Sequence, residues 1–149
     1  MNIQISDVGH IIQLAIAPVF LLTGVATKLG VLANRLGRII DRTRLLEDRL
    51  RNGPNEEYSE ELEVLYTRSH LINYAITSST TCGLLICLVI AMLFLSDTAD
   101  LPLDQIIAAF FVLAMLALIS SFVNLLREIF IAARHMRERH NATLPQQVR

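Results

Sequence analysis

The chain has 149 residues, of which 53% are hydrophobic and 18% are charged, and its formal net charge at pH 7 is −1. A soluble domain usually carries about 25% charged residues, and the charged residues of this chain are also unevenly spaced. Residues 71–95 and 106–126 include no charged side chain, and residues 11–33 include only Lys28. This distribution excludes an ordinary soluble globule, a disordered chain and a secreted disulfide scaffold.

Three apolar segments are long enough to cross a lipid bilayer, and they comprise residues 11–33, 71–95 and 103–126. As helices, their stretches 11–33, 71–95 and 106–126 would be roughly 31–38 Å long, compared with about 30 Å for the hydrocarbon core of a membrane. Because backbone polar groups inside lipid must be satisfied within their own segment, each span is predicted to be an α-helix. Pro18 predicts a kink in the first helix, and we expect Lys28 to extend its ammonium group toward the membrane interface.

Most basic residues lie on one side of the predicted spans. They follow the first or the third span and comprise Arg35, Arg38, Arg42, Arg44, Arg49, Arg51 and Arg68, then Arg127, Arg134, Arg137, Arg139 and Arg149. Cytoplasmic loops carry an excess of Lys and Arg, so we expect the N-terminus outside and residues 34–70 and 127–149 in the cytoplasm. The opposite side carries acidic residues without a balancing cation, and they form a predicted outer rim of Asp7, Asp97, Asp100 and Asp104.

Residues 34–70 have the pattern of two amphipathic helices joined by a turn. Apolar residues recur every three or four positions up to Leu50 and again before the second span, which is typical of helices with one buried face. Gly53 and Pro54 favour a break between the two helices. We therefore predict an all-α integral membrane protein with an antiparallel cytoplasmic hairpin between helices one and two and a cytoplasmic extension of helix three. The chain is predicted to form a single membrane domain over residues 1–149.

Three stretches of sequence, at residues 17–24 (APVFLLTG), 35–42 (RLGRIIDR) and 126–129 (LREI), carry a family resemblance. They resemble an uncharacterised family of bacterial integral membrane proteins, domain of unknown function 2721, and the likeness covers nearly the whole chain. The resemblance implies a small three-span protein of a bacterial inner membrane. It implies no reaction, because the family has no assigned chemistry.

The sequence lacks the side-chain patterns that catalysis or metal binding would need. Cys82 and Cys87 do not form a CxxC pair, and His135 and His140 are not four residues apart, as a helical metal pair would be. The hydroxyl residues near position 80 have no His or Lys partner within the same span. We therefore expect no enzymatic activity, no cofactor and no nucleic-acid partner, and the lipid bilayer is the first partner that the sequence predicts.

Polar residues inside the predicted spans are concentrated in the cytoplasmic halves. They comprise Thr23, Thr27, Thr77, Ser78, Thr81, Ser120, Ser121 and Asn124. Such residues either pack helices closely and form hydrogen bonds between them, or they line a hydrated vestibule that an apolar outer half closes. Three helices cannot enclose a pore, so the second interpretation requires a homo-oligomer.

Charged residues also gather where the first and third helices leave the predicted membrane. Arg38, Asp41, Arg42, Arg127 and Glu128 are predicted to form an ion cluster that joins the two helices. A carboxylate at this depth is poorly hydrated, and burying it without a positive partner would be costly. A structural role is therefore expected for the cluster.

Two functions are compatible with these features. The first is an oligomeric membrane conduit that favours cations, because a repeated acidic rim would concentrate cations at its mouth. The second is a non-conducting scaffold or accessory subunit whose charged cytoplasmic hairpin recruits a protein partner. The second is favoured by the lack of an ionisable residue at the middle of any predicted span, since pumps and transporters usually have one.

Overall fold

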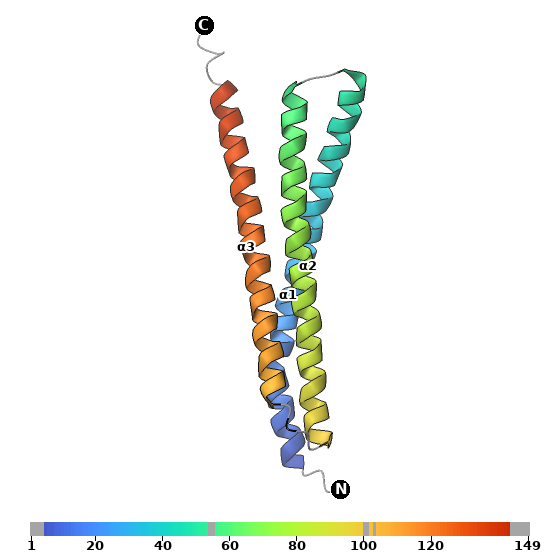
Figure 1. The fold of residues 1–149 in the computed structure, drawn as a ribbon, viewed down its shortest axis with the longest axis vertical. Coiled ribbons are helices and arrows are strands. Elements are labelled where there is room, and N and C mark those ends of the chain that lie inside the picture. Colours follow the sequence, from blue (N-terminus) through green and yellow to red (C-terminus); the bar gives the residue numbers. More distant parts are fainter. Residues whose placement is uncertain (1–4, 54–55, 100–101, 103, 144–149) are drawn as a thin grey trace. The chain divides into compact units, whose positions relative to one another are not determined.

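The computed structural model describes residues 5–53, 56–99, 102 and 104–143, although some side chains within these ranges are not described. The described residues form three α-helices, α1 (Ile5–Asn52), α2 (Glu56–Ala99) and α3 (Asp104–Thr143) (Figure 1). Each helix contains a segment long and apolar enough to cross a membrane, over Ile12–Arg51, Tyr58–Ser96 and Asp104–Arg134. The predictions of an all-α chain and of three helices able to span a membrane are confirmed.

The first predicted span and the arm that follows it form one uninterrupted helix, α1. Pro18 lies inside this helix and is buried, while its predicted kink stays a prediction. The helix ends beside Gly53, whose backbone N–H donates to the carbonyl of Leu50 at 3.4 Å. The break predicted here therefore lies where the helix ends.

Buried residues recur at intervals of seven along all three helices. On α1 they include Pro18, Val25, Leu32, Ile39 and Leu46, on α2 Leu65, Ile72, Ser79 and Ile86, and on α3 Ala114, Ser121 and Glu128. A seven-residue repeat corresponds to 3.5 residues per turn, slightly fewer than the 3.6 of a straight α-helix. It is the pattern of helices that pack as a left-handed coiled coil, with one stripe of each helix facing its neighbours. The buried residues of α1 therefore form one continuous stripe from Pro18 to Leu46.

The chain divides into two compact units. The first unit comprises Met1–Val31 with Ile76–Ser121, and the second comprises Leu32–Ala75 with Phe122–Arg149. The core of the first unit contains Val25, Cys82, Ile86 and Ala114. The outer faces of its helices also carry large apolar side chains, such as Phe20 (75% exposed) and Leu84 (68% exposed). Exposed apolar surface of this kind fits contact with lipid rather than with water.

The second unit packs the two arms of the predicted hairpin against each other. Its buried apolar residues include Leu32, Ile39, Leu46, Leu65 and Ile72. Arg42 contacts Glu61, and Arg49 lies over the ring of Tyr58, so α1 and α2 run in opposite directions within this unit. The side of the membrane on which the arms lie stays a prediction.

Candidate functional site

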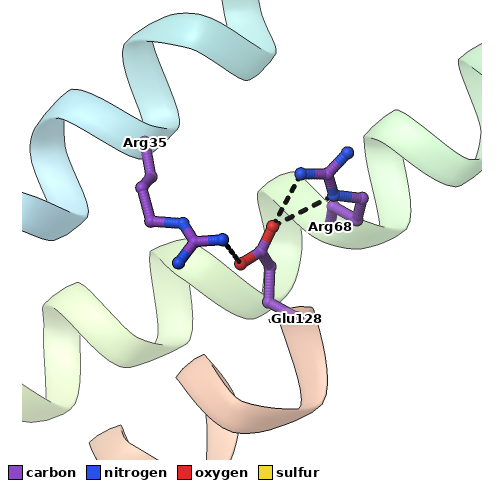
Figure 2. A network of polar contacts seen from close by, with 3 residues as sticks. All are labelled: Arg35, Arg68 and Glu128. Atoms are coloured by element: carbon purple, nitrogen blue, oxygen red, sulfur yellow. Dashed lines mark hydrogen bonds and ion pairs between the residues drawn. The ribbon is translucent and has the colours of Figure 1, made fainter. Parts of the chain in front are cut away.

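A buried carboxylate on α3 contacts arginines from both other helices of the second unit. Glu128 is fully buried, and its Oε1 accepts hydrogen bonds from Arg68 Nε at 3.0 Å and Arg68 Nη2 at 2.8 Å. Its Oε2 lies 3.0 Å from Arg35 Nη2 (Figure 2). The three side chains come from α3, α2 and α1 respectively, so this triad ties together all three helices of the unit.

The charges of this triad are not balanced, because two guanidinium groups face a single carboxylate. The Arg35 contact is an ion pair whose geometry does not make a hydrogen bond, so Glu128 Oε2 has no hydrogen-bond partner among the described residues. The Arg35 and Arg68 side chains keep 27% and 22% of their surface exposed. Partial exposure lowers the cost of the surplus positive charge, because the guanidinium edges away from Glu128 can be solvated.

A second ion pair joins α1 to α2 in the same unit. Arg42 donates from Nε to Glu61 Oε1 at 2.8 Å and from Nη2 to Oε2 at 3.2 Å. Two parallel bonds of this kind make the strongest arrangement of an arginine with a carboxylate. Glu61 is buried. A further contact between the same two helices is the hydrogen bond that the Tyr66 hydroxyl donates to Glu47 at 2.7 Å. The facing arms are therefore joined by polar as well as apolar contacts.

A buried lysine contacts two serines in the first unit. Lys28 Nζ donates to Ser121 Oγ at 2.8 Å, and the Ser121 and Ser79 hydroxyls lie 2.7 Å apart. Lys28 is only 9% exposed, so its ammonium does not extend outward as expected from the sequence. The physical reason is position: Lys28 follows Val25 by three residues and so lies on the buried stripe of α1.

The basic residues of these contacts are seven positions apart on α1. Their partners in chain order are Ser121 for Lys28, Glu128 for Arg35, Glu61 for Arg42 and the Tyr58 ring for Arg49, whose guanidinium carbon lies 6.0 Å from the ring centre. Four residues that take part in these contacts, Arg35, Arg68, Glu61 and Ser79, are not among those predicted from the sequence. A basic residue at every seventh position beside an apolar stripe of the same period was the signal that could have identified the α1 members.

The predicted ion cluster is not formed as a single group. Glu128 is buried and Arg42 is half-buried, and the two belong to separate groups of contacts. Arg38, Asp41 and Arg127 are exposed. Their positions explain the difference. Arg38 and Arg127 are each next to a buried residue, and Asp41 follows the buried Ile39 by two positions, so all three side chains point away from the core.

The predicted polar residues of the spans differ in burial and in the groups to which they are hydrogen-bonded. Thr23 donates to the carbonyl of Val19 at 3.3 Å, Thr27 to that of Thr23 at 3.0 Å and Thr81 to that of Thr77 at 2.9 Å. These donors are exposed and are satisfied by their own helix, as threonines facing lipid can be. The remaining members differ in burial: Thr77 and Ser120 are exposed, Ser78 and Asn124 are half-buried, and Ser121 is buried.

The predicted outer acidic rim falls largely beyond what the structure describes. Asp104 is exposed at the start of α3. Asp100 lies outside the described residues, and the side chains of Asp7 and Asp97 are not described. The rim therefore stays a prediction.

An apolar groove of about 280 Å³ lies between α1 and α2 in the first unit. Its lining includes Ile16, Phe20, Ile90 and Phe94, and almost none of the lining surface is polar. A groove with this lining could accommodate a hydrocarbon chain, and it supplies no polar group that would orient a substrate.

The contact of Lys28 with Ser121 resembles a base beside a nucleophile, which is the arrangement that catalytic serines need. Ser121 and Ser79 are fully buried, however, and Lys28 is nearly so. A substrate bond would have to reach the Ser121 hydroxyl within about 3 Å. Burial prevents that approach, so the three side chains act in this structure as a packing contact.

The family model for a protein of unknown function, DUF2721, matches residues 15–138 of the chain. This match covers most of all three helices, including every residue of the two buried ion-pair groups. No curated protein and no solved structure matches the chain.

Proposed function

The chain belongs to the DUF2721 family, and we propose that it is a non-conducting membrane scaffold or accessory subunit of a bacterial inner membrane. In this proposal the first unit anchors the protein in lipid, and the second unit presents a rigid charged surface to a protein partner in the cytoplasm. The N-terminus lies outside, in keeping with the distribution of basic residues.

The observation that carries the proposal is that polar groups of the core and of the spans are bonded to other groups of the chain. The buried carboxylates of Glu61 and Glu128 contact partly buried arginines, and Lys28 contacts a buried hydroxyl group. Exposed threonines of the spans, such as Thr27, donate to backbone carbonyls of their own helix. A conduit needs polar groups that converge on a common path. The core is instead closed by direct side-chain contacts, which suits a rigid structural element.

The outer faces of the second unit offer a surface for a partner. The exposed charged residues of α1 in this unit are of both signs, four basic (Arg38, Arg44, Arg49 and Arg51) and three acidic (Asp41, Glu47 and Asp48). Those of α2 include Glu56, Glu60 and Glu63. A face of mixed charge beside an acidic face favours one orientation of a charged partner, because electrostatic complementarity contributes to specificity and to the rate of association. We propose no catalytic reaction, and the burial of Ser121 supports this.

An oligomeric cation conduit is a second candidate, and one observation favours it. Thr23, Thr27, Thr80, Thr81 and Ser120 are exposed on the outside of the helices within the predicted spans. Hydroxyl groups on outer faces could line a path only between several copies of the chain, so this candidate requires a ring of subunits.

Purified protein in liposomes distinguishes the two candidates. We expect no potassium or proton flux above that of protein-free liposomes, and a detergent-extracted particle too small for a ring. A particle of four or more copies, with flux that Thr27→Val and Thr81→Val reduce, would reject the scaffold in favour of the conduit. Ser69→Ala, in a half-buried residue outside the predicted spans, is the matched control.

The partner surface has its own test in cells. A photo-crosslinking residue at Glu60 should give a discrete protein adduct that Glu63→Lys weakens, whereas the same residue at Leu84 should crosslink only to lipid. Equal adducts at Glu60 and Leu84, or no effect of the charge reversal, would contradict the proposed surface.

A further inference from the structure

Positive charge is in excess where the three helices leave the predicted spans. Within five residues of the span ends at 33, 71 and 126, the charged side chains of the second unit are Arg35, Arg38, Arg68, Arg127 and Glu128. The one carboxylate among them, that of Glu128, is paired with Arg35 and Arg68. Arg38 and Arg127 are exposed, so this group, which we call the arginine girdle, presents positive charge from α1, α2 and α3.

Donor groups of the girdle remain open to a further ligand. Arg35 forms an ion pair with Glu128 Oε2, and this contact lacks the geometry of a hydrogen bond. One terminal nitrogen of Arg35 and one of Arg68 point away from Glu128 (Figure 2). Each guanidinium has five N–H donors, so the edge turned away from the carboxylate can bind an anion while the other edge is held in place.

The depth of the girdle identifies the anion. At 1.5 Å per residue, Arg35, Arg68 and Arg127 lie about 2–5 Å beyond the hydrocarbon edge of the predicted spans. The polar headgroups occupy that layer of a bilayer. Beside Arg127, α3 exposes Leu126 (54%) and Phe130 (66%). Arginines beside exposed apolar side chains are the combination that binds at the boundary of headgroups and acyl chains.

We infer that the arginine girdle binds the phosphate groups of anionic phospholipids. Glu128 positions Arg35 and Arg68 for this role, while Arg38 and Arg127 contact the headgroups directly. The inference rests on the membrane assignment and on the predicted span ends. It does not depend on whether the protein is a scaffold or a conduit, so its test is separate from the flux measurement.

The test measures lipid retention and thermal stability of the full chain in nanodiscs. Phosphatidylglycerol is titrated into phosphatidylcholine, and bound lipid is counted by native mass spectrometry. We expect phosphatidylglycerol to be retained in preference and to raise the melting temperature. Arg38→Gln and Arg127→Gln change exposed side chains of the described chain. Each should weaken phosphatidylglycerol binding about fivefold, corresponding to about 1 kcal/mol per basic residue at an anionic surface.

Two controls decide the outcome. Arg51→Gln changes an exposed arginine far from the span ends and should leave phosphatidylglycerol binding unchanged, whereas Arg35→Lys, which keeps the charge, should retain more binding than Arg35→Gln. Equal retention of the two lipids, or an equal effect of Arg51→Gln and Arg127→Gln, would overturn the inference. Stabilisation by inorganic phosphate alone to the same degree would also overturn it, because the ligand would then be a soluble anion.

Discussion

Glu128 has the most constrained environment of the described charged residues. It is fully buried, yet both of its oxygens face arginines from other helices. Desolvating an ion pair can cost as much as its attraction gains, whereas removing one partner leaves a buried charge uncompensated. The triad is therefore better understood as fixing which residues of the three helices lie opposite one another than as a large net source of stability.

Glu128→Ala should lower the free energy of unfolding by about 3–5 kcal/mol, because it leaves two arginines facing each other without a carboxylate. The matched control is Asp41→Ala, which removes an exposed carboxylate near the same predicted membrane edge and should change stability by less than about 0.5 kcal/mol. The measurement is thermal or denaturant unfolding in a fixed detergent.

A double-mutant cycle identifies the stronger partner of Glu128. Arg68 makes two hydrogen bonds to the carboxylate and Arg35 makes an ion pair only, so the coupling energy with Arg68 should be the larger of the two. Equal losses from Glu128→Ala and Asp41→Ala would show that the carboxylate is solvated rather than buried.

At the scale of the helix, the seven-residue repeat explains why adjacent residues have opposite surroundings. Leu46 is fully buried on the stripe of α1, whereas Leu45 is 44% exposed. Both are leucines in the middle of the same helical arm, so their helix propensities are equal. A difference in unfolding free energy between their alanine variants therefore reports packing alone.

Leu46→Ala should therefore destabilise the second unit by about 2–5 kcal/mol through lost burial and a residual cavity. Leu45→Ala should change stability by less than about 0.5 kcal/mol, since an exposed surface substitution leaves no cavity. Urea unfolding followed by circular dichroism is the measurement. A larger loss from Leu45→Ala would mean that this arm is packed through a different face.

At the scale of the whole molecule, the segments that join the helices report the orientation of the chain in the membrane. Gly53 is exposed at the end of α1, and Pro102 is exposed between α2 and α3. The predicted three spans place these two positions on opposite sides of the bilayer, and the excess of basic residues places Gly53 in the cytoplasm.

Single cysteines at Gly53 and Pro102, in a background with Cys82→Ala and Cys87→Ala, test this arrangement. Pro102→Cys should react with a membrane-impermeant thiol reagent in intact cells, and Gly53→Cys should react only after permeabilisation. Inverted vesicles should reverse the pattern. Labelling of both cysteines from the same side would reject the three-span topology.

The sequence by itself determined the properties that depend on neighbours along the chain. Long uncharged segments require helices able to cross a membrane, and Gly53 with Pro54 favours the break after α1. Both follow from local physical chemistry, namely hydropathy and the backbone preferences of glycine and proline. The three apolar helices, and the end of α1 beside Gly53, were therefore predictable.

The tertiary structure alone decided which polar side chains meet. From the sequence, Asp41 and Glu128 were predicted to be equivalent members of one cluster, and Lys28 was predicted to reach the membrane interface. In the structure Asp41 is exposed, whereas Glu128 and Lys28 are buried. Each outcome depends on which stripe of a helix faces its neighbours and on which residues of the other helices lie opposite. Those contacts join residues 60 and 93 positions apart along the chain, so no local pattern specifies them, and only the packing of three helices brings the partners together.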